Sequence, residues 1–179
     1  NDKKNYSDYC SSRNNLKKFT QHICSNSFQS ELKNIFLQNN INVGYNFDNY
    51  SYNLKNKIKK FLKIQGQTFY NIIELSSIPF KGGYINPHTD GMNKIFSLII
   101  PIVNNDEYKS AENYSTDILE HLDDKDSFNR VNKMISKDKV KTVKKIEFKK
   151  RQILCLIKTH NSLHSVGPIN YDGLKEAYR

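Results

Sequence analysis

The sequence predicts an α+β domain in which helices come first and a jelly-roll-like barrel of short strands follows. Apolar residues recur at helical spacing in the N-terminal part. After Gly66 the pattern changes to short runs rich in Ile, Tyr and Phe, bounded by Pro and Gly. With 179 residues, the chain has the size of one ordinary domain and is long enough to bury a core.

Helices are expected within residues 1–65, which we interpret as a helical part of the same domain, packed on the barrel. From Asn15 to Leu37 the apolar residues follow roughly helical spacing, with a break near Asn26. From Tyr52 to Ile64 they form one stripe with Lys residues opposite, which predicts an amphipathic helix. The Asn-rich stretch from Asn39 to Asn49 between them is turn-like.

The barrel core is expected over residues 66–179. Its strands are predicted at Phe69 to Ile78, Ile95 to Val103, Thr116 to Leu119, Val143 to Phe148, Gln152 to Lys158 and Ser162 to Ile169. Gly82 and Gly83 indicate a tight turn after the first of these strands. The polar stretch 104–141 has weak helical spacing, and we interpret it as an insertion between core strands that shapes a substrate pocket.

Composition excludes several classes of protein. The longest apolar run, Ile95 to Val103, is too short to cross a bilayer, and no secretory signal pattern is visible. Three widely spaced Cys without a Cys-x-x-Cys pair predict neither a disulfide framework nor a zinc ribbon. We therefore expect a reducing, cytoplasmic setting and no membrane partner.

The net charge of +10 raises the question of a nucleic-acid partner. Only four of the 28 basic residues are Arg, and 23 Asn accompany the Lys residues. This pattern indicates a compositional bias of the source, since specific nucleic-acid sites depend on bidentate contacts from Arg. A nucleic-acid partner is therefore not favoured, and solvated Lys faces are the simpler interpretation.

His88 and Asp90 are the first candidates for chemistry. Residues two apart in a strand or at its exit point the same way, so this pair can present an imidazole and a carboxylate to one ion. A second imidazole would complete the two-His-one-carboxylate set that non-haem Fe(II) oxygenases use. A His-x-Asp pair alone is common by chance, and the structural alternative is a turn in which Asp90 caps the next segment.

His160 and His164 follow the predicted strand Gln152 to Lys158, and either can supply the second imidazole. They lie four residues apart, so strand alternation does not separate them. The structural alternative for His164 is a buried histidine whose ring nitrogens are satisfied by the backbone.

The order of these motifs resembles the Fe(II)/2-oxoglutarate-dependent dioxygenase superfamily, especially its prolyl-hydroxylase-like bacterial and phage members. The matching segments are Pro87 to Asp90, with Lys94 and an apolar strand after them, and Lys158 to Ile169. The likeness covers roughly residues 66 to 179. In that family a Val-x-Pro sequence follows the distal ligand, which favours His164 over His160.

The resemblance implies a double-stranded β-helix, the cupin-like form of the jelly roll, with Fe(II) held by His88, Asp90 and His164. It implies that 2-oxoglutarate chelates the iron and that Arg179 binds the distal carboxylate of this cosubstrate. The family continues into another core strand where this sequence stops, and the alternative for Arg179 is a solvated terminal residue.

Tyr84 and Lys94 are further candidates for contact with the cosubstrate. Tyr84 is four residues before His88 and is expected on the same strand face, and its alternative is a half-exposed barrel tyrosine. For Lys94, a solvated lysine at the beginning of a strand is the alternative.

The sequence thus predicts an oxygenase that hydroxylates or otherwise oxidises a small-molecule or peptidyl substrate with O2, releasing succinate and CO2. The alternatives are a non-catalytic jelly-roll binding module, an oxygenase directed at a nucleic acid, and a hydrolase or lyase using Zn²⁺ in the same site. Neither the substrate nor the oligomeric state follows from the sequence.

Overall fold

The structure is a computed structural model that describes residues 9, 12–43, 58, 61–62, 70–79, 81–102, 114–123, 125, 132–170 and 176–178. The chain is a mixed α+β protein with antiparallel sheets, and it divides into two compact units, Asn1–Glu74 and Leu75–Arg179. The sequence analysis predicted this boundary nine residues earlier, between 65 and 66. That the two parts belong to one domain stays a prediction.

The helical unit contains α2 (Asn14–Ile23) and α3 (Asn26–Gln38), so the predicted break near Asn26 is confirmed. The break has a local cause, because the Ser25 hydroxyl accepts a hydrogen bond from the Phe28 N–H at 3.2 Å and begins a new helix. The buried face of α3 carries Phe28, Leu32 and Phe36 at helical spacing. Most of the predicted helix from Tyr52 to Ile64 lies outside the described residues.

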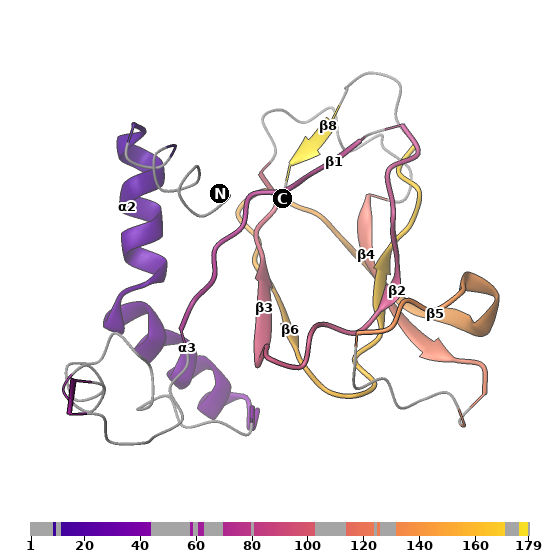
Figure 1. Cartoon of the computed structure of the whole chain (residues 1–179), viewed down its shortest axis with the longest axis horizontal. Helices are drawn as coiled ribbons and strands as arrows, with labels where there is room; N and C mark the ends of the chain where they lie inside the picture. Colours follow the sequence, from indigo (N-terminus) through magenta and orange to yellow (C-terminus); the bar gives the residue numbers. More distant parts are fainter. Residues whose placement is uncertain are drawn as a thin grey trace. The chain divides into compact units, whose positions relative to one another are not determined.

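The second unit contains eight described strands and one 3-10 turn, η4 (Lys137–Lys139). The strands are β1 (Ser77–Pro79), β2 (Ile85–His88), β3 (Phe96–Ile99), β4 (Ser115–His121), β5 (Val140–Glu147), β6 (Leu154–Ile157), β7 (His164–Val166) and β8 (Glu176–Tyr178). All their pairings are antiparallel: β1 with β8, β3 with β6, and a four-stranded sheet in the order β2-β7-β4-β5. Figure 1 shows β3 and β6 on one side of this unit and the four-stranded sheet on the other. The pairing is nested: β1 pairs with β8, β2 with β7, β3 with β6 and β4 with β5.

All six predicted strands overlap observed strands, and the first does so only at its end. Residues 70–76 form no strand, and β1 consists of Ser77 to Pro79 alone. Side chains that favour strands form one only where a partner strand is present. In this region the observed partner, β8, pairs only with Ser77 to Pro79.

The interpretation of 104–141 as an insertion is wrong for β4. This strand lies inside the four-stranded sheet, between β7 and β5, and therefore belongs to the core. Thr116 and Leu119 are buried in it, and the strand predicted at Thr116 to Leu119 is confirmed as part of Ser115–His121. Its polar residues, among them the buried Asp117, gave this segment the composition of an exposed insertion in the sequence. Residues 103–113 of this region lie outside the description.

The core of this unit is a cluster of Ile78, Tyr114, Phe148, Val166 and Ile169. The Tyr114 and Phe148 rings pack edge to face with centroids 5.0 Å apart.

The predicted turn at Gly82 and Gly83 is confirmed and connects β1 to β2. Gly82 has φ +76°, a conformation that glycine adopts without strain. The Gly82 N–H donates to the Ile169 carbonyl at 2.7 Å, and the Ile169 N–H donates to the Gly83 carbonyl at 2.9 Å. These bonds fix the beginning of β2 against the segment after β7, which aligns the two strands that carry the histidines.

Candidate metal centre

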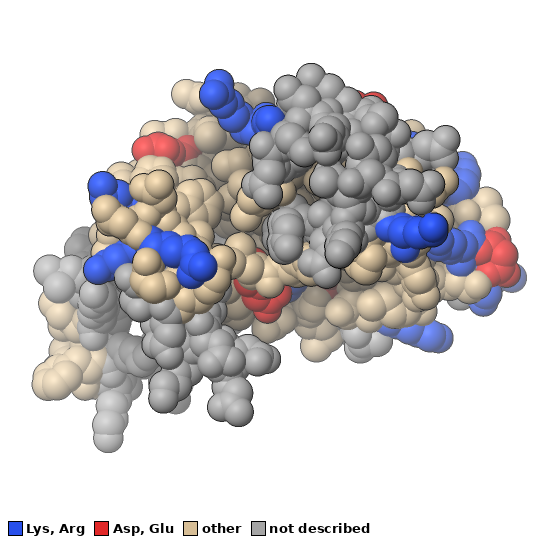
Figure 2. All heavy atoms as spheres, turned by 90° about the horizontal axis from the view of Figure 1, so that it is seen from above, with Lys and Arg blue, Asp and Glu red and all other residues tan. Residues whose placement is uncertain are grey.

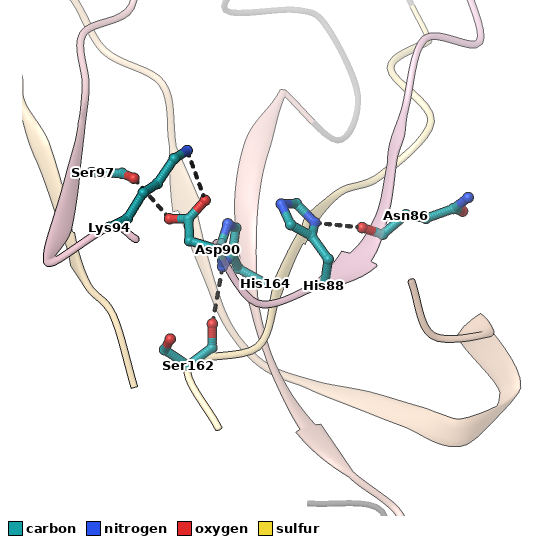
Figure 3. Close-up of polar contacts among 7 residues, drawn as sticks. All are labelled: Asn86, His88, Asp90, Lys94, Ser97, Ser162 and His164. Carbon is teal, nitrogen blue, oxygen red and sulfur yellow. Dashed lines mark hydrogen bonds and ion pairs between the residues drawn. The ribbon is translucent and has the colours of Figure 1, made fainter. Parts of the chain in front are cut away.

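His88, Asp90 and His164 come together at one end of the β2–β7 pair. His88 is the last residue of β2, His164 is the first of β7, and the two are directly opposite each other. One potential ligand atom from each of the three side chains lies within 4.8 Å of the other two. Figure 3 shows the Asp90 carboxylate and the His88 ring on either side of the His164 ring. The group can hold a metal ion.

A bulge in β2 decides which side chains face this cluster. Ile85 pairs with Val166 and His88 pairs with His164, so three steps along β2 match two along β7. Ile85 and His88 therefore share a face, and Tyr84 does not. The prediction that Tyr84 lies on the face of His88 is wrong for this reason. Tyr84 is 56% exposed and has the Lys137 ammonium 5.2 Å from its ring centre.

Backbone carbonyl groups set the tautomer of both histidines. The Nδ1 atom of His88 is 2.8 Å from the backbone carbonyl oxygen of Asn86. The Nδ1 atom of His164 is 3.0 Å from the backbone carbonyl oxygen of Ser162. Because a carbonyl oxygen only accepts hydrogen bonds, each Nδ1 must carry the proton and donate it. In the neutral ring the lone pair is then on Nε2, the atom through which each histidine can bind a metal.

His164 is also held in its neutral form. Burial lowers the pKa of His164 below its ordinary value of 6.5, and the neighbouring His88 and Lys94 act in the same direction. The hydrogen bond to Ser162 and the charge of Asp90 oppose burial without overcoming it. A neutral imidazole at physiological pH requires no proton release before it binds an ion.

Asp90 is held in its ionised form. Its Oδ2 accepts a 2.7 Å hydrogen bond from the Ser97 hydroxyl, and its Oδ1 lies 3.2 Å from the Lys94 ammonium. Burial alone would raise the pKa of Asp90, but Ser97, Lys94 and His164 together outweigh burial and lower the pKa. Two imidazoles and one carboxylate are donors that suit a divalent transition metal.

The other residues that the sequence analysis singled out are His160, Lys94 and Arg179. His160 is exposed in the turn after β6 and is not part of the cluster, so the choice of His164 over His160 agrees with the geometry. Lys94 is 46% exposed and contacts the Asp90 carboxylate. A contact between Lys94 and a cosubstrate stays a prediction. Arg179 lies outside the described residues.

The sequence analysis missed Ser97, which orients the carboxylate ligand. A signal was present, because Ser97 is the one polar residue in the apolar run Ile95 to Val103. A polar side chain at such a position needs a partner on its own face of the strand.

No protein-family model matches the chain, and no curated protein or solved structure matches it either. Among the residues that the structure describes, no helix is both long enough and apolar enough to cross a membrane.

Proposed function

We propose that this chain is a non-haem oxygenase that depends on Fe(II) and 2-oxoglutarate. The observation that carries the proposal is the convergence of His88, Asp90 and His164, with both Nε2 atoms free and the carboxylate ionised. Two imidazoles and one carboxylate on one side of an ion leave open positions for a keto acid and dioxygen, which is the arrangement of the non-haem Fe(II) oxygenases.

We further propose that the second unit, Leu75–Arg179, is a double-stranded β-helix. The nested antiparallel pairs β1–β8, β2–β7, β3–β6 and β4–β5 support this, because a jelly roll of eight strands pairs them in this order. The candidate ligands lie at the end of the β2–β7 pair and just beyond it.

The chain's own residues would prepare the ligands. The Asn86 and Ser162 carbonyls hold the ring protons away from the ion, Ser97 orients the Asp90 carboxylate, and the charge of Lys94 helps to keep that carboxylate ionised. Bound Fe(II) would supply the redox chemistry by which one oxygen atom of O2 enters the substrate and the other enters succinate, as 2-oxoglutarate loses CO2. None of the three ligands gives or takes a proton in this scheme. For the distal carboxylate of the cosubstrate we retain Arg179 as the proposed partner.

A small-molecule or peptidyl substrate is preferred over a nucleic acid. Figure 2 shows the described Lys and Arg side chains at several separate places on the face in view, with Asp and Glu among them. Phosphate backbones are bound by a continuous basic stripe or patch. The described surface on this face therefore offers no support for the nucleic-acid alternative.

The decisive experiment is anaerobic addition of 2-oxoglutarate to the Fe(II)-loaded protein. A weak charge-transfer band in the visible is expected, since chelation of a keto acid to iron produces one. His160→Ala should keep the band and His164→Ala should lose it. Bound iron without a band at saturating 2-oxoglutarate would reject the dioxygenase assignment, even though the metal site would stand. Succinate release across candidate substrates would then identify the reaction.

A further inference from the structure

Lys158 is a cation that the metal cluster does not use. It follows β6 directly, and its backbone N–H donates to the Ile95 carbonyl at 2.9 Å. Its side chain is half-buried, and its Nζ atom is buried without a hydrogen-bond partner among the described residues. An ammonium group deprived of both water and a partner is strongly destabilising, so a group at this position calls for an anion.

The strand register places Lys158 on the face of the β3–β6 pair that looks toward Asp90. Ser97 is directly opposite Leu156 in this pair, so their side chains share a face. Lys158 is two residues beyond Leu156 and therefore also lies on that face. Ser97 donates to the Asp90 carboxylate from the same face, so Lys158 lies on the face of the β3–β6 pair that contacts the metal cluster.

The charges around Asp90 agree with this placement. Burial lowers the pKa of Lys158 below its ordinary value, and the negative charge of Asp90 opposes this effect without overcoming it. The two carboxylate oxygens of Asp90 already accept hydrogen bonds, one from Ser97 and the other from Lys94. A divalent ion with Lys94 and Lys158 beside one carboxylate leaves an excess of positive charge that favours acidic ligands.

A second buried polar atom lies on β4, in the four-stranded sheet. Thr116 is fully buried, and its hydroxyl oxygen has no hydrogen-bond partner among the residues described. Ile118 is directly opposite His164, and Thr116 is two residues from Ile118 on the same strand, so Thr116 shares the face of the histidines. Lys158, beside the β3–β6 pair, and Thr116, in the four-stranded sheet, therefore both offer polar groups to a ligand beside the cluster.

We propose that Lys158 binds a carboxylate of an acidic ligand that lies beside the metal cluster. The inference deepens the proposed function and rests on it for the location of the ligand. Two sources share this chemistry: an acidic primary substrate, which leaves the distal carboxylate of the cosubstrate to Arg179, and the dicarboxylate cosubstrate itself, in which case Lys158 takes the place proposed for Arg179. A charge-assisted contact of this kind should change affinity by about ten- to a hundredfold.

The test is calorimetry on Zn²⁺-loaded protein, in which no turnover occurs. The probes are 2-oxoglutarate and 2-oxopentanoate, which carries a methyl group in place of the distal carboxylate. The variants are Lys158→Met, Lys158→Arg and, as a control, Lys149→Met, which removes the same charge from an exposed ion pair with Glu147. A Zn²⁺ titration of each variant verifies that the metal site is intact.

If the cosubstrate is the source, Lys158→Met should weaken binding of 2-oxoglutarate about ten- to a hundredfold and leave 2-oxopentanoate unchanged. Lys158→Arg should retain part of the affinity, and Lys149→Met all of it. If an acidic substrate is the source, binding of 2-oxoglutarate should be unchanged in Lys158→Met. In that case saturation-transfer NMR with acetate, on protein saturated with 2-oxoglutarate, should show acetate binding to the wild type and not to Lys158→Met.

Unchanged binding of 2-oxoglutarate together with Lys158-independent binding of acetate would overturn the inference. The same measurement with acetate on metal-free protein tests Lys158 even if the proposed function is wrong. Failure of the wild type to bind 2-oxoglutarate would reject the dioxygenase assignment, whereas a loss of acetate binding in Lys158→Met alone would still support the anion site.

Discussion

His88 and His164 are directly opposite each other on β2 and β7, with ring centroids 4.5 Å apart and planes inclined by 52°. Residues paired in this way on antiparallel strands share one face, however far apart they are in the sequence. Each ring is also held by a carbonyl two residues earlier in the chain. The imidazoles are therefore oriented by the backbone before any ion binds, which lowers the cost of assembling the site.

Removal of a candidate ligand should abolish tight metal binding. In anaerobic Fe(II) titrations, His88→Ala, Asp90→Ala and His164→Ala should each lose most of the affinity, because two donors hold an ion much more weakly than three. His160→Ala is the matched control and should bind about one ion per chain. Loss of iron in His160→Ala with retention in His164→Ala would move the third ligand to His160.

Ser97→Ala should weaken metal binding about ten- to a hundredfold, the usual effect of losing a hydrogen bond that orients a ligand. The reason is that the Asp90 Oδ2 atom loses its 2.7 Å donor, which also raises the pKa of the carboxyl. Ser115→Ala is a matched control, since the buried Ser115 hydroxyl donates to Asp117 at 2.8 Å away from the cluster. Equal metal affinity in the two variants would contradict the role of Ser97.

Lys94→Met should tighten metal binding at neutral pH on the order of a few-fold, because a half-exposed ammonium near the ion repels it and competes for Asp90. The acid limb of the binding curve should move to higher pH, since the pKa of Asp90 is no longer lowered by this charge. Lys141→Met removes another Lys–carboxylate pair of 3.2 Å, with Glu120, and should change neither property. Weaker binding at neutral pH would show that Lys94 supports the ligand instead.

The stability of the metal-free protein should fall as the pH drops below about 6.5, the ordinary pKa of histidine. The folded-state pKa of His164 lies lower, so over this range the unfolded chain takes up a proton that the folded chain refuses. The contribution is fully present above pH 6.5 and is lost as the pH falls toward the folded-state pKa. Its slope is at most about 1.4 kcal/mol per pH unit.

Urea denaturation followed by circular dichroism checks this pH dependence. His164→Gln should remove this part of the slope, and His160→Gln should retain it. An unchanged slope in His164→Gln would assign the proton uptake to another group.

Gly83→Ala should be much more destabilising than Gly82→Ala. A Cβ at Gly83 would lie 2.1 Å from the Pro79 oxygen and 2.5 Å from the Ile78 side chain, so the turn would have to open at a cost of about 3 kcal/mol or more. A Cβ at Gly82 meets nothing within 4 Å, and only its φ of +76° costs about 1–2 kcal/mol. Thermal unfolding compares the two, and similar values would mean that the turn rearranges freely.

The sequence by itself determined those structural features that depend only on residues close together along the chain. Helical spacing predicted α2 and α3, and the Ser25 cap explains why they separate where the pattern breaks. Most of the strands were predicted from short apolar runs. The closeness of His88 and Asp90 follows from a spacing of two residues, and the likeness of motifs selected His164.

Only the tertiary structure decided what depends on strand pairing. The bulge in β2 reversed the expected face of Tyr84, because one extra residue inverts the alternation that a sequence pattern assumes. The place of β4 inside a sheet, and the positions of Ser97 and Lys158 toward Asp90, come from partners distant in the sequence. Side-chain period tells which residues share a face, but register and partner are set by packing across the whole unit of antiparallel strands, so no local pattern contains them.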